Sequence, residues 1–267
     1  MAAEQAAETN AAAHGAEGEA HGEAHGPLDQ FEIEPILPIT VGNLDLSFTN
    51  SSLWMAIAVA LVYGLVMVGS RHGSMIPGRL QSLVELTYEF IGSVVRENAG
   101  HEGRRYFPFF FTLFMFILFG NTLGLIPGSF TYTSHIIVTF SMAIFVVTAV
   151  TVIGFMKHGL HFLRLFAPSG CPLYIMPLLV PIEILSYAMR PISLSLRLGI
   201  NMTAGHIMLV TFSGFIIALG SFYILPGVLP FAVTTALYGL ELMIAFLQAY
   251  VFTVLSCIYL YDCLHLH

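Results

Sequence analysis

The sequence predicts an all-α, polytopic membrane protein with about five membrane helices and one amphipathic helix at the membrane surface. Hydrophobic residues make up 57% of its 267 residues, and charged residues only 9%. A soluble domain has about 25% charged residues, so this composition excludes an ordinary soluble fold. Apolar runs long enough to cross a ~30 Å hydrocarbon core recur along the chain. The last two are much longer than a membrane crossing needs, and we expect those helices to be strongly inclined.

The acidity of the chain is concentrated at its N-terminus. The first 34 residues hold eight of the 16 acidic residues and no Lys or Arg. Residues 1–26 contain mainly Ala, Gly, Glu and His, which cannot bury a core. We therefore predict a disordered acidic tail and lead-in at 1–34 and a single transmembrane domain at 35–267. Three tail histidines could bind a metal weakly, but a solvated tail is the simpler interpretation. They are His14, His21 and His25.

The first predicted membrane helix is the apolar run from Leu53 to Val68. Arg71 and Arg79 follow it, and basic residues favour the cytoplasmic side of a membrane. The N-terminus is therefore expected outside. Residues 77–98 then alternate apolar and charged positions at helical spacing. They predict an amphipathic helix that lies in the inner interface or packs on other helices.

Two further membrane helices are predicted at 106–126 and 134–156. Arg104, Arg105 and Lys157 flank them on the side expected to face inward. Asn121 is polar within the second of the chain's spans. It could form a hydrogen bond between helices or line a water path.

The remainder of the chain is apolar and is divided by Pro226, Gly227 and Pro230 into two long helical stretches. The first, residues 172–219, is far longer at ~1.5 Å per residue than a ~30 Å core requires. It contains no proline or Gly–Gly pair after Pro191. We expect an inclined helix, kinked at Pro191 at most, and not an upright hairpin. The second stretch covers roughly residues 231–262.

Five polar side chains interrupt the first of these stretches. A charge at the centre of a bilayer costs at least ~2.5–3.5 kcal/mol, so such residues are rarely incidental. Glu183, Arg190 and Arg197 are seven residues apart and share a helix face. Asn201 stays close to that face, whereas His206 lies opposite. The pattern predicts a cation stripe toward one neighbouring helix and an imidazole toward another.

The second stretch carries Glu241 and Gln248, again seven residues apart. Imidazole and carboxylate groups exchange protons most readily near neutral pH. A guanidinium does not deprotonate in proteins, so Arg197 can act only as a fixed positive charge. Together these groups predict a proton path that cannot pass straight through, although simple pairing between helices remains an alternative. A second polar route would be supplied by Glu183, Ser186 and Ser193.

Three segments of this region resemble subunit a of the F-type ATP synthase membrane sector: PIEILSYAMRPIS, SLRLGINMTAGH and LELMIAFLQAYVFTVLSCIYL. The resemblance runs from about residue 27 and includes GNTLGLIPG. It implies that the essential arginine of that family is Arg197, within an R-L-x-x-N pattern. The other implied proton-path residues are His206 and Glu241 in the outer half-channel, Glu183 in the inner one, and Asn201 and Gln248.

The resemblance also implies a function. Such a subunit forms two offset half-channels against a rotating c-ring and couples proton flow to rotation. It is a stator component and not an enzyme by itself, and no cofactor is expected. The implied partners are c-ring proteolipids, peripheral-stalk b-type subunits, membrane lipid and, indirectly, the catalytic head. The chain has no G-x-x-x-x-G-K-[ST] motif and no basic face for nucleic acid.

The implied location is the bacterial inner membrane, with the N-terminus outside and the C-terminus inside; the mitochondrial inner membrane is the alternative. A self-contained ion channel or secondary antiporter is a competing class. It would hold its whole ion site in one chain, yet the sequence has no intramembrane Asp pair and no internal repeat. A structural anchor would not need Arg197 or Glu241 within apolar segments.

Overall fold

The computed structural model describes residues 35–37, 40–41, 44–45, 47–71, 78–126, 129–159, 162, 174, 176–220 and 224–265. All of them belong to one compact unit, Ile33–His267. The predicted acidic tail, residues 1–34, lies outside the described residues and stays a prediction.

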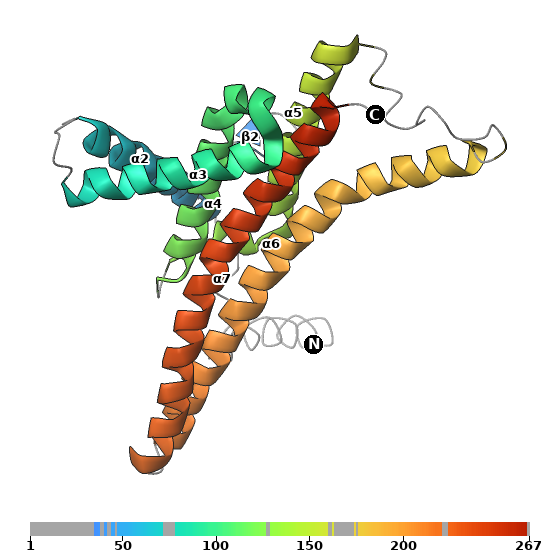
Figure 1. Ribbon diagram of the computed structural model, residues 1–267. Coiled ribbons are helices and arrows are strands. Elements are labelled where there is room, and N and C mark those ends of the chain that lie inside the picture. The colour runs from blue at the N-terminus through green and yellow to red at the C-terminus, as the bar shows by residue number, and fades with distance from the viewer. Residues whose placement is uncertain are drawn as a thin grey trace, which may run out of the picture. The chain divides into compact units, whose positions relative to one another are not determined.

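The predicted all-α membrane architecture is confirmed. Among the described residues, five helices are long and apolar enough to cross a membrane. The amphipathic helix α3 runs through η2 (Arg104–Tyr106) directly into the second of them (Figure 1). The five are α2 (Asn50–Ser70), α4 (Phe107–Gly124), α5 (Ile136–His158), α6 (Met176–Gly220) and α7 (Ile224–Leu264).

The amphipathic helix α3 (Arg79–Gly103) packs against α2, α4 and α7. Its apolar face is buried through Ile91 and Val95, while Arg96 on the other face is exposed. Gly100 has a φ of 67° near the end of α3. A glycine tolerates this left-handed conformation without the steric penalty of a side chain, which lets the chain turn toward α4.

Four short strands, which the sequence pattern does not predict, precede α2. They form two antiparallel pairs, β1 with β4 and β2 with β3. Apolar residues alternate only over the short run 44–49, and each strand has two or three residues, so the periodic signal is weak. The strands are β1 (Pro35–Leu37), β2 (Thr40–Val41), β3 (Leu44–Asp45) and β4 (Phe48–Thr49).

Helix α6 is continuous over 45 residues, with Pro181 and Pro191 inside it. This confirms the single long helix and contradicts an upright hairpin. At ~1.5 Å per residue α6 is ~68 Å long, against ~45 Å for a bilayer with its headgroup regions. A straight helix of that length fits within the bilayer only when it inclines by roughly 50° from the membrane normal.

The predicted position of the break before α7 is wrong by several residues. We expected Pro226 and Pro230 to end the helical pattern, but α7 begins at Ile224 and includes both. The first four N–H groups of a helix have no partner within the helix, so Pro226 costs little in the first turn. Pro230 removes one further hydrogen bond, and α7 continues beyond it.

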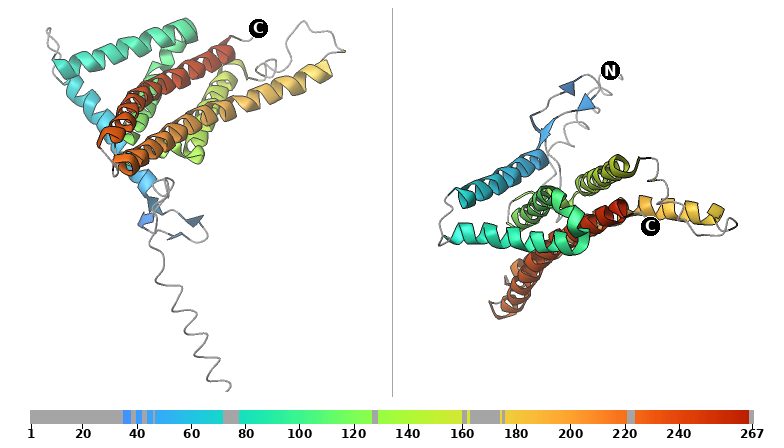
Figure 2. Two further views of the ribbon diagram at one scale, coloured as in Figure 1. Left: turned by 90° about the horizontal axis from the view of Figure 1, so that it is seen from below. Right: turned by 45° about the horizontal axis from the view of Figure 1, so that its top comes forward.

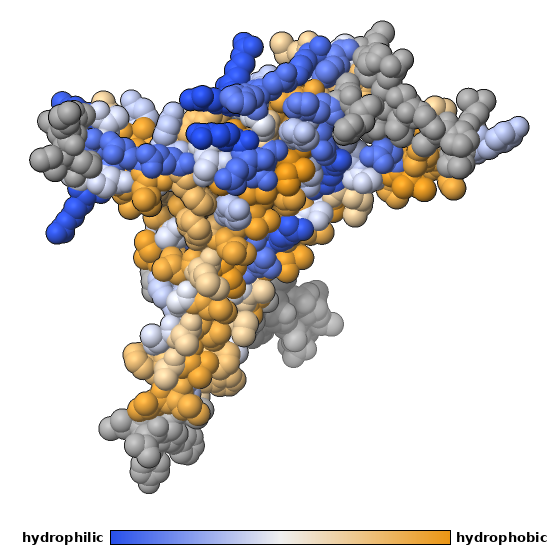
Figure 3. All heavy atoms as spheres, viewed as in Figure 1, coloured by the Kyte–Doolittle hydropathy of each residue, from blue (hydrophilic) through white to orange (hydrophobic). Residues whose placement is uncertain are grey.

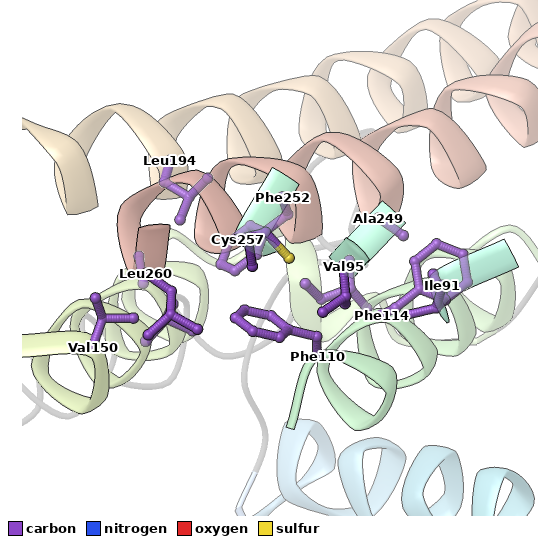
Figure 4. Packing of buried hydrophobic residues seen from close by; sticks show 14 of the residues in the cluster. Ile91, Val95, Phe110, Phe114, Val150, Leu194, Ala249, Phe252, Cys257 and Leu260 are labelled. Carbon is purple, nitrogen blue, oxygen red and sulfur yellow. The ribbon is translucent and has the colours of Figure 1, made fainter. Parts of the chain in front are cut away.

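A shared apolar core holds α6 and α7 against the shorter helices. Side chains of α3, α4, α5, α6 and α7 meet in this core (Figure 4). Leu194 is the α6 side chain that the figure labels. Cys257 and Cys263 are buried free thiols in the same cluster, where they pack as small apolar side chains. The other labelled residues are Ile91, Val95, Phe110, Phe114, Val150, Ala249, Phe252, Cys257 and Leu260.

The ends of α3, α5 and α7 meet at one hydrophilic end of this unit (Figure 3). Lys157 forms an ion pair with Glu102, which joins α5 to α3. A ring nitrogen of His158 lies 3.1 Å from the carbonyl oxygen of Leu264, which joins α5 to α7. Arg105 and Lys157, two of the basic residues expected on one side of the membrane, line the same pocket here.

Candidate functional site

The candidate site is the interface between α6 and α7. These two helices run antiparallel, lie side by side near their connection and diverge toward the start of α6 (Figures 1 and 2). Polar residues of α7 recur at multiples of seven positions, at Glu241, Gln248 and Asp262, and therefore share one face of that helix. Among the described residues, each of them contacts a polar side chain of α6.

The first contact joins His206 of α6 to Glu241 of α7. The distance from Nδ1 of the imidazole to Oε1 of the carboxylate is 3.9 Å. The Glu241 side chain is nearly fully buried, and neither of its oxygens has a hydrogen-bond partner among the described residues. A buried carboxylate beside an imidazole is a pair that can accept and pass on a proton.

Gly205 provides the space for the Glu241 carboxylate. A Cβ atom at Gly205 would lie 2.7 Å from Oε1 of Glu241 and 3.0 Å from its Cδ. A glycine in the middle of a helix costs roughly 0.5–1 kcal/mol relative to alanine, so this one is not explained by helix stability.

We expect Gly205→Ala to leave assembly intact but to slow proton transfer, because the added methyl group moves the carboxylate. A misplacement of about 1 Å can cost roughly 100-fold in rate, which sets the upper limit of the effect. The measurement is proton flux in membrane vesicles. Gly214→Ala is the matched control on the same helix, since nothing lies within 4 Å of its added Cβ. Equal flux in the two variants would contradict this role of Gly205.

The second contact joins Asn201 to Gln248. The Asn201 side chain donates a hydrogen bond from Nδ2 to Oε1 of Gln248 at 3.2 Å. Gln248 is buried, whereas Asn201 is exposed. This bond fixes α6 and α7 in register between the first and third contacts.

The third contact was missed from the sequence. Arg190 lies 3.3 Å from Oδ2 of Asp262. Its guanidinium also lies over the rings of Tyr187 and Tyr259, at 5.2 and 4.9 Å from their centroids. The available signal was that Asp262 follows Gln248 by fourteen residues, which places it on the same face of α7.

Arg197, unlike Arg190, Asn201 and His206, forms no side-chain contact of this kind with α7 among the described residues. Its side chain is exposed, and within the described part of the chain no ion pair or hydrogen bond engages it. Leu194 and Leu198, beside it on α6, are buried in the core. Helix α6 contacts α5, η3 (Tyr132–Ser134) and α7. Arg197 therefore lies on the face of α6 that these elements leave uncovered.

The prediction that His206 faces a different helix from the arginines is wrong. Arg190 and His206 both contact α7, and the charge of Arg197 also acts on Tyr259 of α7. A straight helix drifts by ~20° per heptad relative to a perfect seven-residue repeat. Because α6 and α7 also cross, α7 meets different faces of α6 at different positions.

The structure does not bring Glu183, Ser186 and Ser193 into this series of contacts. Glu183 is half-buried and the two serines are exposed. None of them has an ion-pair or hydrogen-bond partner in the part of the chain described here. The start of α6, where Glu183 and Ser186 lie, diverges from α7 (Figure 2). Glu183 is ~35 Å from His206 along α6, at ~1.5 Å per residue.

Polar groups near the connection between α4 and α5 approach the His206–Glu241 pair. Thr203 donates a hydrogen bond to the Ser134 carbonyl oxygen at 3.0 Å. Asn121 donates one from Nδ2 to the Ala245 carbonyl oxygen at 3.2 Å, one helical turn from Glu241. This confirms a helix-to-helix bond for Asn121. Its buried Oδ1 has no partner among the described residues, so the water-path alternative also stays open.

Comparison with known proteins decides the family. The family described as "ATP synthase A chain" matches residues 52–261, which include nearly all of α2 to α7. The chain belongs to the ATP synthase A chain family. All eight predicted site residues, from Glu183 to Gln248, lie within the matched region.

Several bacterial members of the ATP synthase A chain family match over 90% of this chain. A protein of Paramagnetospirillum magneticum is 53% identical, and the match covers 99% of its length. One from Mesorhizobium japonicum is 53% identical over 96% of its length, and one from Rhodospirillum rubrum is 51% identical over 99%. Each is named ATP synthase subunit a.

Proposed function

We propose that this chain is the proton-translocating subunit a of an F-type ATP synthase and works against a rotating ring of c-type proteolipids. The observation that carries the proposal is Arg197, a permanent cation on an uncovered face of an apolar helix. Among the described residues no ion pair engages this charge, so an anionic partner from another subunit would stabilise it in the membrane. An ionised carboxylate on a proteolipid helix meets that need.

In this proposal protons enter from outside through His206 and Glu241. Support comes from their 3.9 Å separation and from the polar groups near the α4–α5 connection. The proton then moves to a ring carboxylate, which is neutral while it travels through lipid. After nearly a full turn the proton leaves near Glu183, whose distance from His206 keeps the two half-channels apart.

Arg197 separates the two half-channels. Its guanidinium stabilises the ionised ring carboxylate and cannot itself carry a proton. A proton thus has no relay from His206 to Glu183 along α6 and has to travel on the ring. Asn201 and Gln248 support this arrangement through the hydrogen bond that sets the register of α6 and α7.

The chain acts as a non-catalytic part of the complex, with peripheral-stalk b-type subunits as neighbours and the catalytic head as an indirect partner. We place it in a bacterial inner membrane. The last residues of α3, α5 and α7 lie together where the surface is hydrophilic and carries arginine and lysine. Basic residues favour the inner side of a membrane, which supports a C-terminus on that side. The N-terminus then lies outside.

A self-contained channel is the second candidate, and one experiment separates the two. The purified chain in liposomes should pass no protons under an imposed gradient, because its half-channels lack the ring that connects them. The complete membrane sector should conduct in the same assay. Proton conduction by the chain alone, at the rate of the membrane sector, would overturn the stator proposal.

A further inference from the structure

A basic pocket on the hydrophilic end of the molecule takes no part in the proton path. It is a cavity of about 290 Å³ between α3, η2 and the start of α4. Arg96, Arg104 and Arg105 line it, and no acidic residue does. All three arginines are exposed, and within the described residues none of them forms an ion pair. The nearby Glu102 is engaged by Lys157.

The other wall of this pocket is aromatic. Tyr88 packs edge-on against Phe107, with ring centroids 4.5 Å apart, and Phe111 lies next to them. The Tyr88 side chain is more than half exposed. Guanidinium groups therefore lie beside an exposed apolar surface at the end of a membrane helix.

We propose that this pocket binds the headgroup of an anionic phospholipid from the leaflet on the arginine side. The phosphate would take hydrogen bonds from Arg96, Arg104 and Arg105, for which planar guanidinium groups are well suited. An acyl chain would lie along Tyr88 and Phe107. A soluble phosphate ion would make no apolar contact with the aromatic wall, whereas a phospholipid would. Basic pockets beside membrane helices are typical sites for anionic headgroups.

Gly92 keeps the pocket open. A Cβ atom there would meet only Phe107, at 3.8 Å, which is an ordinary contact. A larger side chain at this position therefore occupies the cavity without clashing with the backbone. The cavity volume is roughly ten times the ~30 Å³ share of one water in the liquid, so a phosphodiester group fits.

The test counts lipids bound to the full-length chain in detergent by native mass spectrometry. Titrations use phosphatidylglycerol, phosphatidylcholine and inorganic phosphate. Each basic residue near an anionic group contributes about 1 kcal/mol, or roughly fivefold. We expect phosphatidylglycerol to be preferred over phosphatidylcholine, and each single Arg→Gln change at Arg96, Arg104 or Arg105 to weaken its binding about fivefold.

Two further variants make the test specific. Gly92→Leu should lower phosphatidylglycerol binding although no charge changes, while Arg79→Gln, an exposed arginine on the same helix outside the pocket, should have no effect. Equal binding of the two lipids, or full binding by the triple Arg→Gln variant, would overturn the proposal. Competition by inorganic phosphate at the lipid's own concentration would overturn it in favour of a phosphate site. An acidic protein segment bound there in place of lipid would overturn it as well.

Discussion

Replacing Arg197 by alanine should abolish ATP-driven proton pumping and allow protons to leak passively through the membrane sector. An opposite charge within ~4–6 Å favours an ionised carboxylate by about 1.4–4 kcal/mol. Without that charge, the ring carboxylate keeps its proton where it should release it. Nothing then separates the two half-channels. Acridine-dye quenching in inverted vesicles measures pumping, and decay of an imposed pH gradient measures the leak.

An Arg→Lys change at Arg197 and at Arg190 tests whether coupled pumping depends on the guanidinium at the uncovered position in particular. Arg197→Lys should also fail, because a lysine lacks the planar fork and can lose its proton when buried. Arg190→Lys should retain at least about half of the coupled pumping, since lysine can still pair with Asp262. Normal pumping by Arg197→Lys, or equal loss in both variants, would contradict the role assigned to Arg197.

The second large effect is expected at the His206–Glu241 pair. His206→Ala and Glu241→Ala should each slow proton entry at least about tenfold, because a positioned proton-transfer group typically contributes 10²–10⁴-fold. ATP hydrolysis by the detached catalytic head should be unchanged. Proton flux driven by an imposed gradient is the measurement.

An exchange of the two residues tests their contact directly. His206→Glu alone places two carboxylates opposite each other, and Glu241→His alone places two imidazoles opposite each other. The double exchange restores one of each, so it should be milder than the sum of the single changes. Contacting residues couple by 0.5–3 kcal/mol, or about 2- to 150-fold. Strict additivity of the three measurements would show that the two side chains do not work together.

Much of the fold follows from sequence patterns that are local in the chain. The apolar runs predict the membrane helices, and the unbroken phase of polar residues across Pro191 predicts a continuous α6. The start of α7 was placed too late, because a proline near a helix N-terminus is tolerated there. The short strands before α2 were missed, since segments of two or three residues carry little periodic signal.

Sequence spacing predicts which polar residues belong to the site, but not which helix face each occupies. The roles of Arg197, His206 and Glu241 stay predictions. Whether an α6 side chain meets α7 or lies uncovered depends on how the two helices cross, which a heptad count cannot supply. For that reason the Arg190–Asp262 pair, 72 positions apart in the chain, was found only in the structure.

The central claim is that the uncovered face of α6 works against a proteolipid ring, and cysteine cross-linking in native membranes tests it most directly. Single cysteines replace Ser193, Ile200 and Met208 on the uncovered face, and Leu198 and Met202 on the core face. The native cysteines are first changed to alanine. We predict cross-links to a small two-helix proteolipid from all three uncovered positions and from neither core position. Cross-links from the core positions, or none from the uncovered face, would contradict the account.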